Sequence, residues 1–282
     1  DLEALDATIA LLRARREWPA LVSTLEQRQQ APVSRAQKRD DLVTIARLKA
    51  DQLDDLPGAI ETWLSVRSEF GEDREVLAAL DELLTKEKDF KQLAELLDGA
   101  VTRERRDTSA RLVRLATVLV DELARHEAAL PLMEQALELD PHDEDAHLAA
   151  ATLLEIPECA ERVSDALWRA YAKSERSEDQ LDLLDRRVAS IADPAKKAEA
   201  LAEGARLLEN HAASPAKALA ALVKALPLSP NRRDLRSEIV RLASTTENWF
   251  EAAAAFKQAA AALDDDGPSA AELRRQEASI LE

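Results

Sequence analysis

The sequence predicts an all-α protein built as a solenoid of antiparallel helical hairpins. The first observation is an internal repeat, because the segment Leu42–Ala46 returns 70 positions later as the similar segment Leu112–Ala116. A fixed period of this kind is typical of arrays in which each unit buries its apolar face only against its neighbours. The second observation is composition, because alanine and leucine dominate and aromatic residues make up only 3% of the chain. Both dominant residues are strong helix formers.

One kind of hairpin carries an acidic or amide residue followed by an aromatic residue at its central turn. The pairs Glu17-Trp18, Asp89-Phe90 and Asn248-Trp249 mark three copies, and a degenerate copy lies around Leu181 and Leu184. Apolar residues follow each pair at spacings that place them on one face of a helix. We therefore expect the aromatic residues to pack in the core at the start of the second helix of each hairpin.

The second kind of hairpin is bounded by proline-containing turns. Asp140-Pro141 and Ser229-Pro230 are expected to close two helices, while Asp193-Pro194 and Ser214-Pro215 open the next ones. Asp and Ser are favoured N-cap residues, and proline is tolerated in the first helical turn. The turn chemistry therefore agrees with helix boundaries at these positions.

Two hairpins together form one unit of about 72 residues, the spacing between Trp18 and Phe90. We read the units as 1–72, 73–159 and 160–231, followed by a partial unit 232–282. The second unit is longer because residues 143–156 are expected to add a short helix, which should perturb the superhelix locally. The chain starts at Asp1, and Met133 is its only methionine. From this, and from an expected last helix with no following partner, we expect a fragment of a longer chain.

Charge and composition disfavour several classes of function. The 55 acidic and 38 basic residues give a formal net charge of −17. Nucleic-acid backbones and anionic membranes attract clustered Lys and Arg, so neither nucleic acid nor direct membrane insertion is expected. Only five glycines occur, too widely spaced for a phosphate-binding loop. Cys159 is the single cysteine, so no internal disulfide can form.

Small or apolar residues recur in the second hairpin at spacings of four, three and five, ending on proline. The run is Ala129, Met133, Ala136 and Pro141, and it returns as Ala218, Leu222, Ala225 and Pro230, while the first unit has Ala59, Trp63 and Val66 with Gly71 in place of proline. This pattern resembles the tetratricopeptide repeat. The resemblance implies a right-handed α-α superhelix that holds a partner peptide or helix in its concave groove. The glycine expected early in the first helix is Arg47, Thr117 and Arg206 here, and other helical-pair repeats such as HEAT remain an alternative.

If tetratricopeptide geometry holds, the first helices of the second hairpins line the groove. The expected partner-binding residues are Asp51, Gln52, Arg111, Arg114, Asp121, Glu122, Asn210 and His211. The same set of helix positions also contains Asp41, Thr44, Leu48, Val118, Ala200, Glu203 and Leu207. Arg111 and Arg114 lie one turn apart and follow Arg103, Arg105 and Arg106, so a guanidinium cluster could clamp a carboxylate or an acidic peptide. The alternative is a solvated helix face with local ion pairs to Glu104 and Asp107.

Catalytic, cofactor and metal sites are not expected. The four histidines are scattered, and Cys159 has no local partner signature, so it is expected to pack. The segment Asp140–His147 combines two histidines with several carboxylates, but acidic residues are favoured at a helix start and no recognised ligand spacing is present. The segment Asp264–Asp266 does not match a calcium-binding loop either.

The sequence therefore predicts a non-enzymatic protein–protein interaction scaffold. Two alternatives stay open, a structural spacer within a larger protein and an accessory helical domain of an enzyme. Arginine exceeds lysine and alanine is abundant, which weakly indicates a bacterial gene. The partner's identity, the compartment (cytoplasmic or periplasmic) and the oligomeric state are left undetermined.

Overall fold

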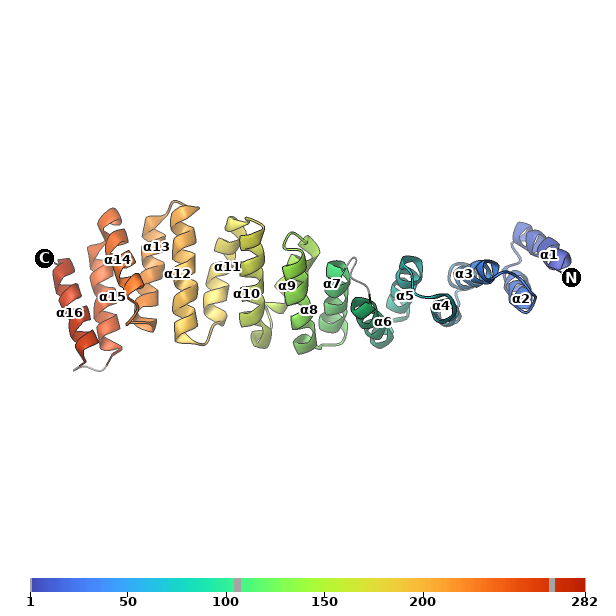
Figure 1. Cartoon of the computed structure of the whole chain (residues 1–282), viewed down its shortest axis with the longest axis horizontal. Coiled ribbons are helices and arrows are strands. Elements are labelled where there is room, and N and C mark those ends of the chain that lie inside the picture. The colour runs from blue at the N-terminus through green and yellow to red at the C-terminus, as the bar shows by residue number, and fades with distance from the viewer. Residues whose placement is uncertain (1, 104–107, 264–266, 282) are drawn as a thin grey trace. The chain divides into compact units, whose positions relative to one another are not determined.

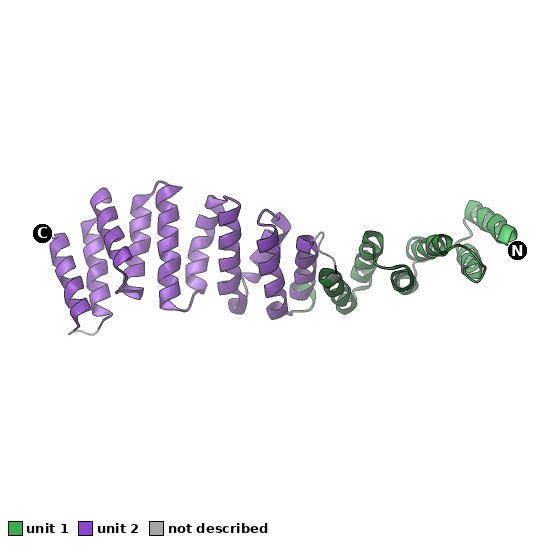
Figure 2. Ribbon diagram, in the orientation of Figure 1, with its two compact units in different colours: residues 1–106, 121–124 green, residues 107–120, 125–282 purple. Residues whose placement is uncertain are grey.

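The computed structural model describes residues 2–103, 108–263 and 267–281, with the side chain of Arg103 also left out. Within these residues the regular structure is entirely helical (Figure 1), which confirms the predicted all-α class. The chain divides into two compact units (Figure 2). Unit 1 comprises residues 1–106 and 121–124, and unit 2 comprises residues 107–120 and 125–282.

Unit 1 is a succession of helices in which each packs against the next one along the chain. Its apolar centre includes Ile9, Leu21, Leu25 and Ile45, all at most 6% exposed. Trp18 and Phe90 begin helices α2 and α6, where the sequence placed them, but both are only partly buried. The helices are α1 (Leu2–Arg15), α2 (Trp18–Gln29), α3 (Arg35–Gln52), α4 (Leu56–Phe70), α5 (Arg74–Glu87) and α6 (Phe90–Arg103).

A buried ion pair joins helices α2 and α3 of unit 1. Asp41 is 2% exposed, and the guanidinium of Arg28 binds both of its carboxylate oxygens, with Nε 2.9 Å from Oδ2. The amide of Gln37 donates a further hydrogen bond of 2.9 Å to Asp41 Oδ1. The hydrogen bond between Arg28 and Asp41 is the main cause of the raised pKa of Arg28. This two-fold contact is the geometry in which arginine binds carboxylates most strongly.

Unit 2 contains the remaining helices and a larger apolar core, in which Phe256 and Ile239 are fully buried. The second helix of unit 2 follows the π-helical turn η1 (Val118–Glu122) along the chain. The helices are α7 (Thr108–Thr117), α8 (His126–Leu139), α9 (Glu144–Leu153), α10 (Pro157–Lys173), α11 (Ser177–Ser190), α12 (Pro194–Asn210), α13 (Pro215–Ala225), the short 3-10 helix η2 (Leu226–Leu228), α14 (Arg233–Thr246), α15 (Trp249–Ala261) and α16 (Pro268–Leu281).

The helices of unit 2 form two layers. Helix α7 contacts α9, α8 contacts α10, and α13 contacts α15, so each of these helices lies beside the second helix after it. Side-chain contacts extend the series, because Arg176 at the start of α11 binds Glu144 of α9, and Lys196 of α12 binds Glu161 of α10. Odd-numbered helices therefore form one layer and even-numbered helices the other.

We call the contact line between neighbouring helices of the even-numbered layer a seam. Arg162 of α10 binds Glu134 of α8 at 2.6 Å, and Arg241 of α14 binds Glu209 of α12 at the same distance. Lys196 and Glu161 link α10 and α12 at 2.9 Å. In each pair the basic side chain is exposed and the glutamate is half-buried, so each pair contributes at most about 1 kcal/mol. Their regular placement nonetheless covers the seams with polar side chains.

The predicted turn residues have mixed outcomes. Asp193 is the N-cap of α12, and its carboxylate accepts hydrogen bonds from the backbone N–H groups of Ala195 and Lys196. These bonds lower the pKa of Asp193. Ser214 stands at the N-cap position of α13, but its hydroxyl makes no capping hydrogen bond. A helix, α9, lies within the range 143–156, and its first residues are capped by Asp143.

Candidate protein-binding surfaces

The arginines predicted to anchor a partner lie on α7 in unit 2. Arg111 and Arg114 are half-buried, and each has an interaction within the structure. They alternate on this helix with the buried residues Leu112, Val113 and Leu115. Arg105 and Arg106 lie outside the described residues, as do Glu104, Asp107 and the side chain of Arg103.

The other predicted groove residues are exposed but distributed over separate elements. Asp51 and Gln52 end α3 in unit 1, and Asp121 and Glu122 lie in η1 and are grouped with unit 1. Asn210 ends α12 in unit 2, and His211 follows it with its Nδ1 3.2 Å from the hydroxyl of Ser177. The structure therefore does not bring the eight residues together within one unit.

Two observations describe where the expected groove positions lie. Helix α7 belongs to the odd-numbered layer and α12 to the even-numbered layer, so Arg111 and Asn210 do not share a layer. In addition, three residues at the predicted groove positions are buried, namely Asp41 at 2%, Val118 at 1% and Ala200 at 0% exposure. Asp41 packs against α2 through Arg28, and the other two are apolar side chains of the core. These positions face neighbouring helices and not solvent.

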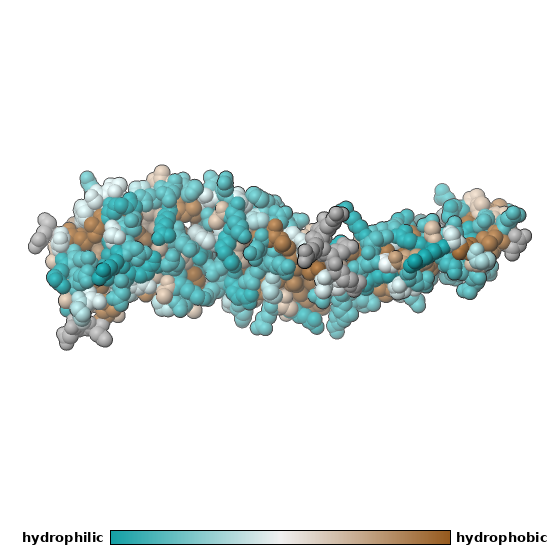
Figure 3. All heavy atoms as spheres, viewed as in Figure 1, coloured by the Kyte–Doolittle hydropathy of each residue, from teal (hydrophilic) through white to brown (hydrophobic). Residues whose placement is uncertain are grey.

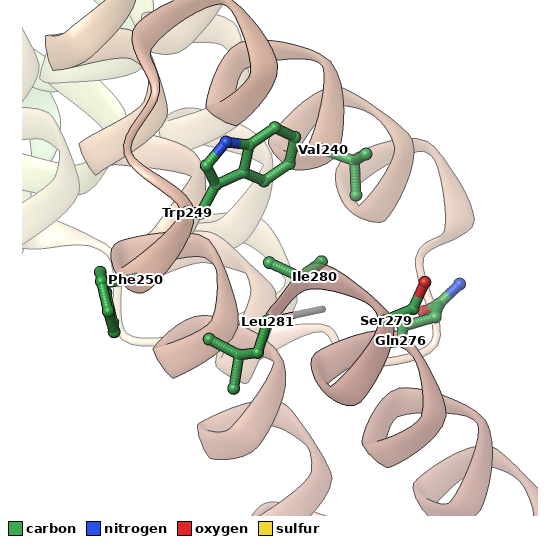
Figure 4. Close-up of a pocket in the computed structure, with 7 residues that line it drawn as sticks. All are labelled: Val240, Trp249, Phe250, Gln276, Ser279, Ile280 and Leu281. Atoms are coloured by element: carbon green, nitrogen blue, oxygen red, sulfur yellow. The ribbon is translucent and has the colours of Figure 1, made fainter.

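The structure shows a different candidate surface, a pocket between α14, α15 and α16. Its volume is about 630 Å³. Figure 4 shows Trp249 from the start of α15 directed toward Val240 of α14, with the last turns of α16 beside them. The lining residues are Val240, Trp249, Phe250, Gln276, Ser279, Ile280 and Leu281. We call this surface the α14–α16 pocket.

Large apolar side chains around the α14–α16 pocket are exposed to solvent. Phe250 is 85% exposed, Leu281 is 55% exposed, and Val240 is 39% exposed. Figure 3 shows apolar atoms beside α16 on a molecular face that is otherwise mostly hydrophilic. Clustered exposed apolar residues of this kind are typical of interaction sites. The pocket is therefore an open apolar surface that a second molecule could cover.

The pocket lies at the seam between α14 and α16, beyond the ion pair that links these helices. Arg236 and Glu272 link the first halves of the two helices at 3.4 Å. At the preceding seam, Arg241 in the second half of α14 binds Glu209, and it also binds Glu238 on its own helix. Its two hydrogen bonds raise the pKa of Arg241. In the described residues, the second half of α16 instead offers Gln276, Ser279 and Ile280 to α14.

One feature of the sequence indicates this pocket, namely the second aromatic residue directly after Trp249, although it is not part of the repeat pattern. The apolar series of α15 is Trp249, Ala252, Ala253 and Phe256, whose spacings keep one face toward the core. Phe250 follows Trp249 directly, and successive helical residues are about 100° apart around the axis. A second aromatic residue at that position therefore has to point away from the core.

A buried polar cluster surrounds His147 on α9. The side chain is 5% exposed, and Arg176 donates to its Nδ1 at 2.6 Å. The ring of Tyr171 meets the imidazole edge-on at 4.9 Å, and Arg176 lies over the same Tyr171 ring. Burial, and after it the positive charge of Arg176, lowers the pKa of His147. Burial raises the pKa of Tyr171.

Other sites considered from the sequence have simple structural settings. Cys159 lies in α10 and is 1% exposed, and burial raises the pKa of its thiol. In the part of the chain that the structure describes, no three His, Cys, Asp or Glu side chains are grouped so that they could hold a metal ion. The segment Asp264–Asp266 lies outside that part. None of the described helices combines the length and apolarity needed to span a membrane.

Comparisons with known proteins find similarity only among solved structures. No family model matches the chain, and no curated protein sequence matches it. A tetratricopeptide repeat protein from Parabacteroides merdae is similar over 98% of each chain, with 15% identity and a TM-score of 0.42. The TPR2AB-domain:pHSP90-complex of yeast Sti1 is similar over 88% of this chain and 100% of that chain (12% identity, TM-score 0.35). The P58(IPK) TPR domain is similar over 100% and 80% (14% identity, TM-score 0.34).

Proposed function

We propose that this chain is a helical-repeat scaffold that binds a protein partner at the α14–α16 pocket. The observation that supports this proposal is the exposure of Phe250, an 85% exposed aromatic side chain beside a pocket of about 630 Å³. Covering a large apolar side chain contributes about 1.5–3 kcal/mol. Trp249 adds an aromatic wall, and aromatic residues often dominate the binding energy of protein interfaces.

The arrangement suits a macromolecule better than a small ligand. A small-molecule site typically encloses 70–90% of its ligand's surface. Here Phe250 and Leu281 remain largely in solvent, so a ligand that only fills the pocket leaves them uncovered. A partner that extends across α15 and α16 covers both residues.

The proposal is tested by affinity capture from a lysate of the source organism followed by mass spectrometry. The wild-type chain is compared with Phe250→Ser and with the matched control Leu148→Ser, because Leu148 is also an exposed apolar residue (72%) but lies on α9. We expect Phe250→Ser to lose a partner that the wild type and Leu148→Ser both retain. Equal capture by all three contradicts the pocket as the binding site.

The predicted arginine site is a second candidate surface. Arg111 and Arg114 are half-buried one turn apart on α7, and guanidinium groups bind carboxylates at protein surfaces. The double variant Arg111→Glu, Arg114→Glu is expected to abolish capture of an acidic partner, and its melting temperature is measured beside that of the wild type to verify that it stays folded. Retained capture removes these residues from the proposed function. If a folded wild-type chain captures no partner at all, the spacer or accessory-domain alternatives are favoured.

A further inference from the structure

We infer that the buried cluster around His147 is a pH-sensitive latch between helices α9 and α11, which is closed at neutral pH and opens in mild acid while the rest of unit 2 stays folded. The latch consists of Glu144 and His147 on α9, Tyr171 on α10, and Arg176 at the N-cap of α11. It is separate from the α14–α16 pocket and does not depend on the binding of a partner there.

In the closed latch, one nitrogen of Arg176 binds two groups of α9. Its Nη1 lies 2.6 Å from Nδ1 of His147 and 2.9 Å from Oε1 of Glu144. The ring of Tyr171 contacts both partners, because its centroid lies 4.9 Å from the imidazole centroid and 5.1 Å from Cζ of Arg176. A guanidinium can only donate hydrogen bonds, so this contact requires a neutral imidazole whose Nδ1 accepts.

Protonation of His147 removes the acceptor at the atom to which Arg176 donates. The proton adds to Nδ1, because Nε2 already carries a hydrogen in this tautomer. Two positive donors then face each other across 2.6 Å, and His147 is only 5% exposed, so little water separates them. Nε2 is buried without a hydrogen-bond partner among the described residues, so it does not offset the loss. The contact with Arg176 therefore has to break.

The groups around His147 set the pH at which the latch opens. Burial, and after it the positive charge of Arg176, lowers the pKa of His147, while Glu144, the backbone of Pro141 and Asp143 raise it. The net effect is a pKa below the ordinary histidine value of about 6.5. The latch is therefore closed at neutral pH and opens as the pH falls through this lowered pKa.

The neighbouring helices leave this charge balance in place. Helices α7, α8 and α10 pack against α9, but the charged groups that act most strongly on the imidazole come from α9, the turn before it and Arg176. Tyr171 of α10 remains neutral, because burial raises its pKa. Asp179 of α11 binds Nε of Arg176 at 2.7 Å and can retain the guanidinium after it leaves the imidazole. His211, after α12, lies 3.2 Å from the hydroxyl of Ser177.

Contacts without a histidine limit how far the latch opens. At the other end of the two helices, Arg186 of α11 binds Glu155, which follows α9, at 2.8 Å. On the opposite side of α9, Ser109 of α7 donates a hydrogen bond of 2.9 Å to Asp143. Neither contact depends on the protonation of His147. Opening should therefore separate only the starts of α9 and α11.

The first test uses Tyr171, the only tyrosine of the chain, as a probe of the latch. The chain is prepared with isotope-labelled tyrosine, and the ring signals are followed by NMR between about pH 7.5 and about pH 5. Because the ring contacts both His147 and Arg176, its signals should shift in one transition with a midpoint below about 6.5. His147→Asn should abolish the transition, and the matched controls His142→Asn and His211→Asn should retain it.

Two further variants test the charges of the latch, and they remain informative if His147→Asn fails to fold. Arg176→Gln removes the positive charge and should move the midpoint upward by about half a pH unit or more. Glu144→Gln removes a negative charge and should move it downward. A purely structural role of the cluster predicts no such pair of opposite shifts.

The opening itself is measured by hydrogen exchange and mass spectrometry above and below the midpoint, with correction for the intrinsic pH dependence of exchange. Protection should fall by about tenfold or more in α9 and the first turn of α11, with α12–α16 unchanged. In His147→Asn, protection should be the same at both pH values.

Four results overturn the inference: ring signals of Tyr171 that do not titrate, a transition that persists in His147→Asn, midpoint shifts of the same sign in the two charge variants, and loss of protection throughout unit 2. The last result means that acid unfolds the unit and does not open a latch. Partner capture that depends on Phe250 is unaffected by any of these outcomes, so the proposed function is tested separately.

Discussion

Single residues in this protein show how burial changes the role of a charged side chain. Most charged groups of the chain are exposed, and their ion pairs contribute little to the free energy of unfolding. Asp41 and His147 are different, because they are 2% and 5% exposed and each has an arginine partner. Both were hard to identify in the sequence, since a charged residue at helical spacing looks the same whether it faces solvent or a neighbouring helix.

The first prediction concerns the stability of the protein in acid. Arg176 only donates hydrogen bonds, so Nδ1 of His147 has to accept, and its Nε2 is buried without a hydrogen-bond partner among the described residues. Because the folded state lowers the pKa of His147, the unfolded chain binds a proton at higher pH than the folded chain does. The stability is therefore complete above the unfolded pKa of about 6.5 and is lost as the pH falls toward the lower folded pKa.

Melting temperatures at several pH values between neutral and mildly acidic conditions test this prediction. His147→Asn keeps an acceptor near the position of Nδ1 and cannot be protonated, so the variant should lose less stability on acidification than the wild type. His142→Asn is the matched control, because His142 is exposed on the preceding turn. A wild-type pH profile identical to that of His147→Asn would remove His147 as the cause.

The second prediction concerns Asp41 and Arg28. Replacing Arg28 by Met leaves a buried carboxylate without its guanidinium partner and should cost about 3–5 kcal/mol in the free energy of unfolding. The double variant Arg28→Met, Asp41→Leu should recover most of that loss, because it removes the uncompensated charge as well. Urea denaturation measures both. As a control, Arg162→Met removes an exposed arginine from Glu134 and should cost at most about 1 kcal/mol.

At the scale of helices, the sequence predicted where elements begin and which class they belong to, but not which layer they occupy. Trp18, Phe90 and Trp249 each begin a helix, as their acidic or amide neighbours indicated. The buried spacing of four and three residues in α8 (Ala129, Met133, Ala136) returns in α13 (Ala218, Leu222, Ala225), which lies in the other layer. A helix in either layer packs against neighbours in its own layer and in the other layer, so the same spacing of apolar residues suits both layers. Periodicity therefore identifies a helix without assigning its neighbours.

The third prediction concerns the close packing of α8. Ala129 is 0% exposed, and a larger side chain there has to displace the helices around it. We expect Ala129→Leu to destabilise the protein by about 1–3 kcal/mol, measured by urea denaturation. Ala128→Leu introduces the same side chain one residue earlier at an exposed position and should change stability by less than about 0.5 kcal/mol. Equal effects of the two substitutions would contradict the packing argument.

At the scale of the whole molecule, the division into two compact units has a consequence for cooperativity. In helical repeats, stability is approximately the sum of the units and their nearest-neighbour contacts. A local loss of packing should therefore affect nearby helices more than distant ones. The candidate binding residues could not be predicted at this scale, because the helices that carry Arg111 and Asn210 align in the sequence repeat yet lie in different layers, and because Phe250 departs from that repeat.

The fourth prediction tests this cooperativity. Phe256 on α15 is fully buried, and Phe256→Ala should cost about 3–5 kcal/mol by leaving a cavity. Hydrogen exchange followed by mass spectrometry should then show faster exchange in α12–α16, with α1–α6 of unit 1 unchanged. Phe250→Ala on the same helix removes an identical side chain that is 85% exposed, so it should leave exchange unaltered throughout. Uniformly faster exchange along the chain after Phe256→Ala would contradict independent behaviour of the units.

The two-layer arrangement of unit 2 also limits how such a protein can change length. Helix α9 determines the layer of every helix after it. It lies between α8 and α10 along the chain but in the other layer, so α10 packs beside α8. Deleting α9 alone would exchange the layers of α10 to α16 and separate Arg162 from Glu134. Deleting α9 together with α10 keeps the alternation intact. Lengthening or shortening of this array, in evolution or by engineering, should therefore proceed in steps of two helices.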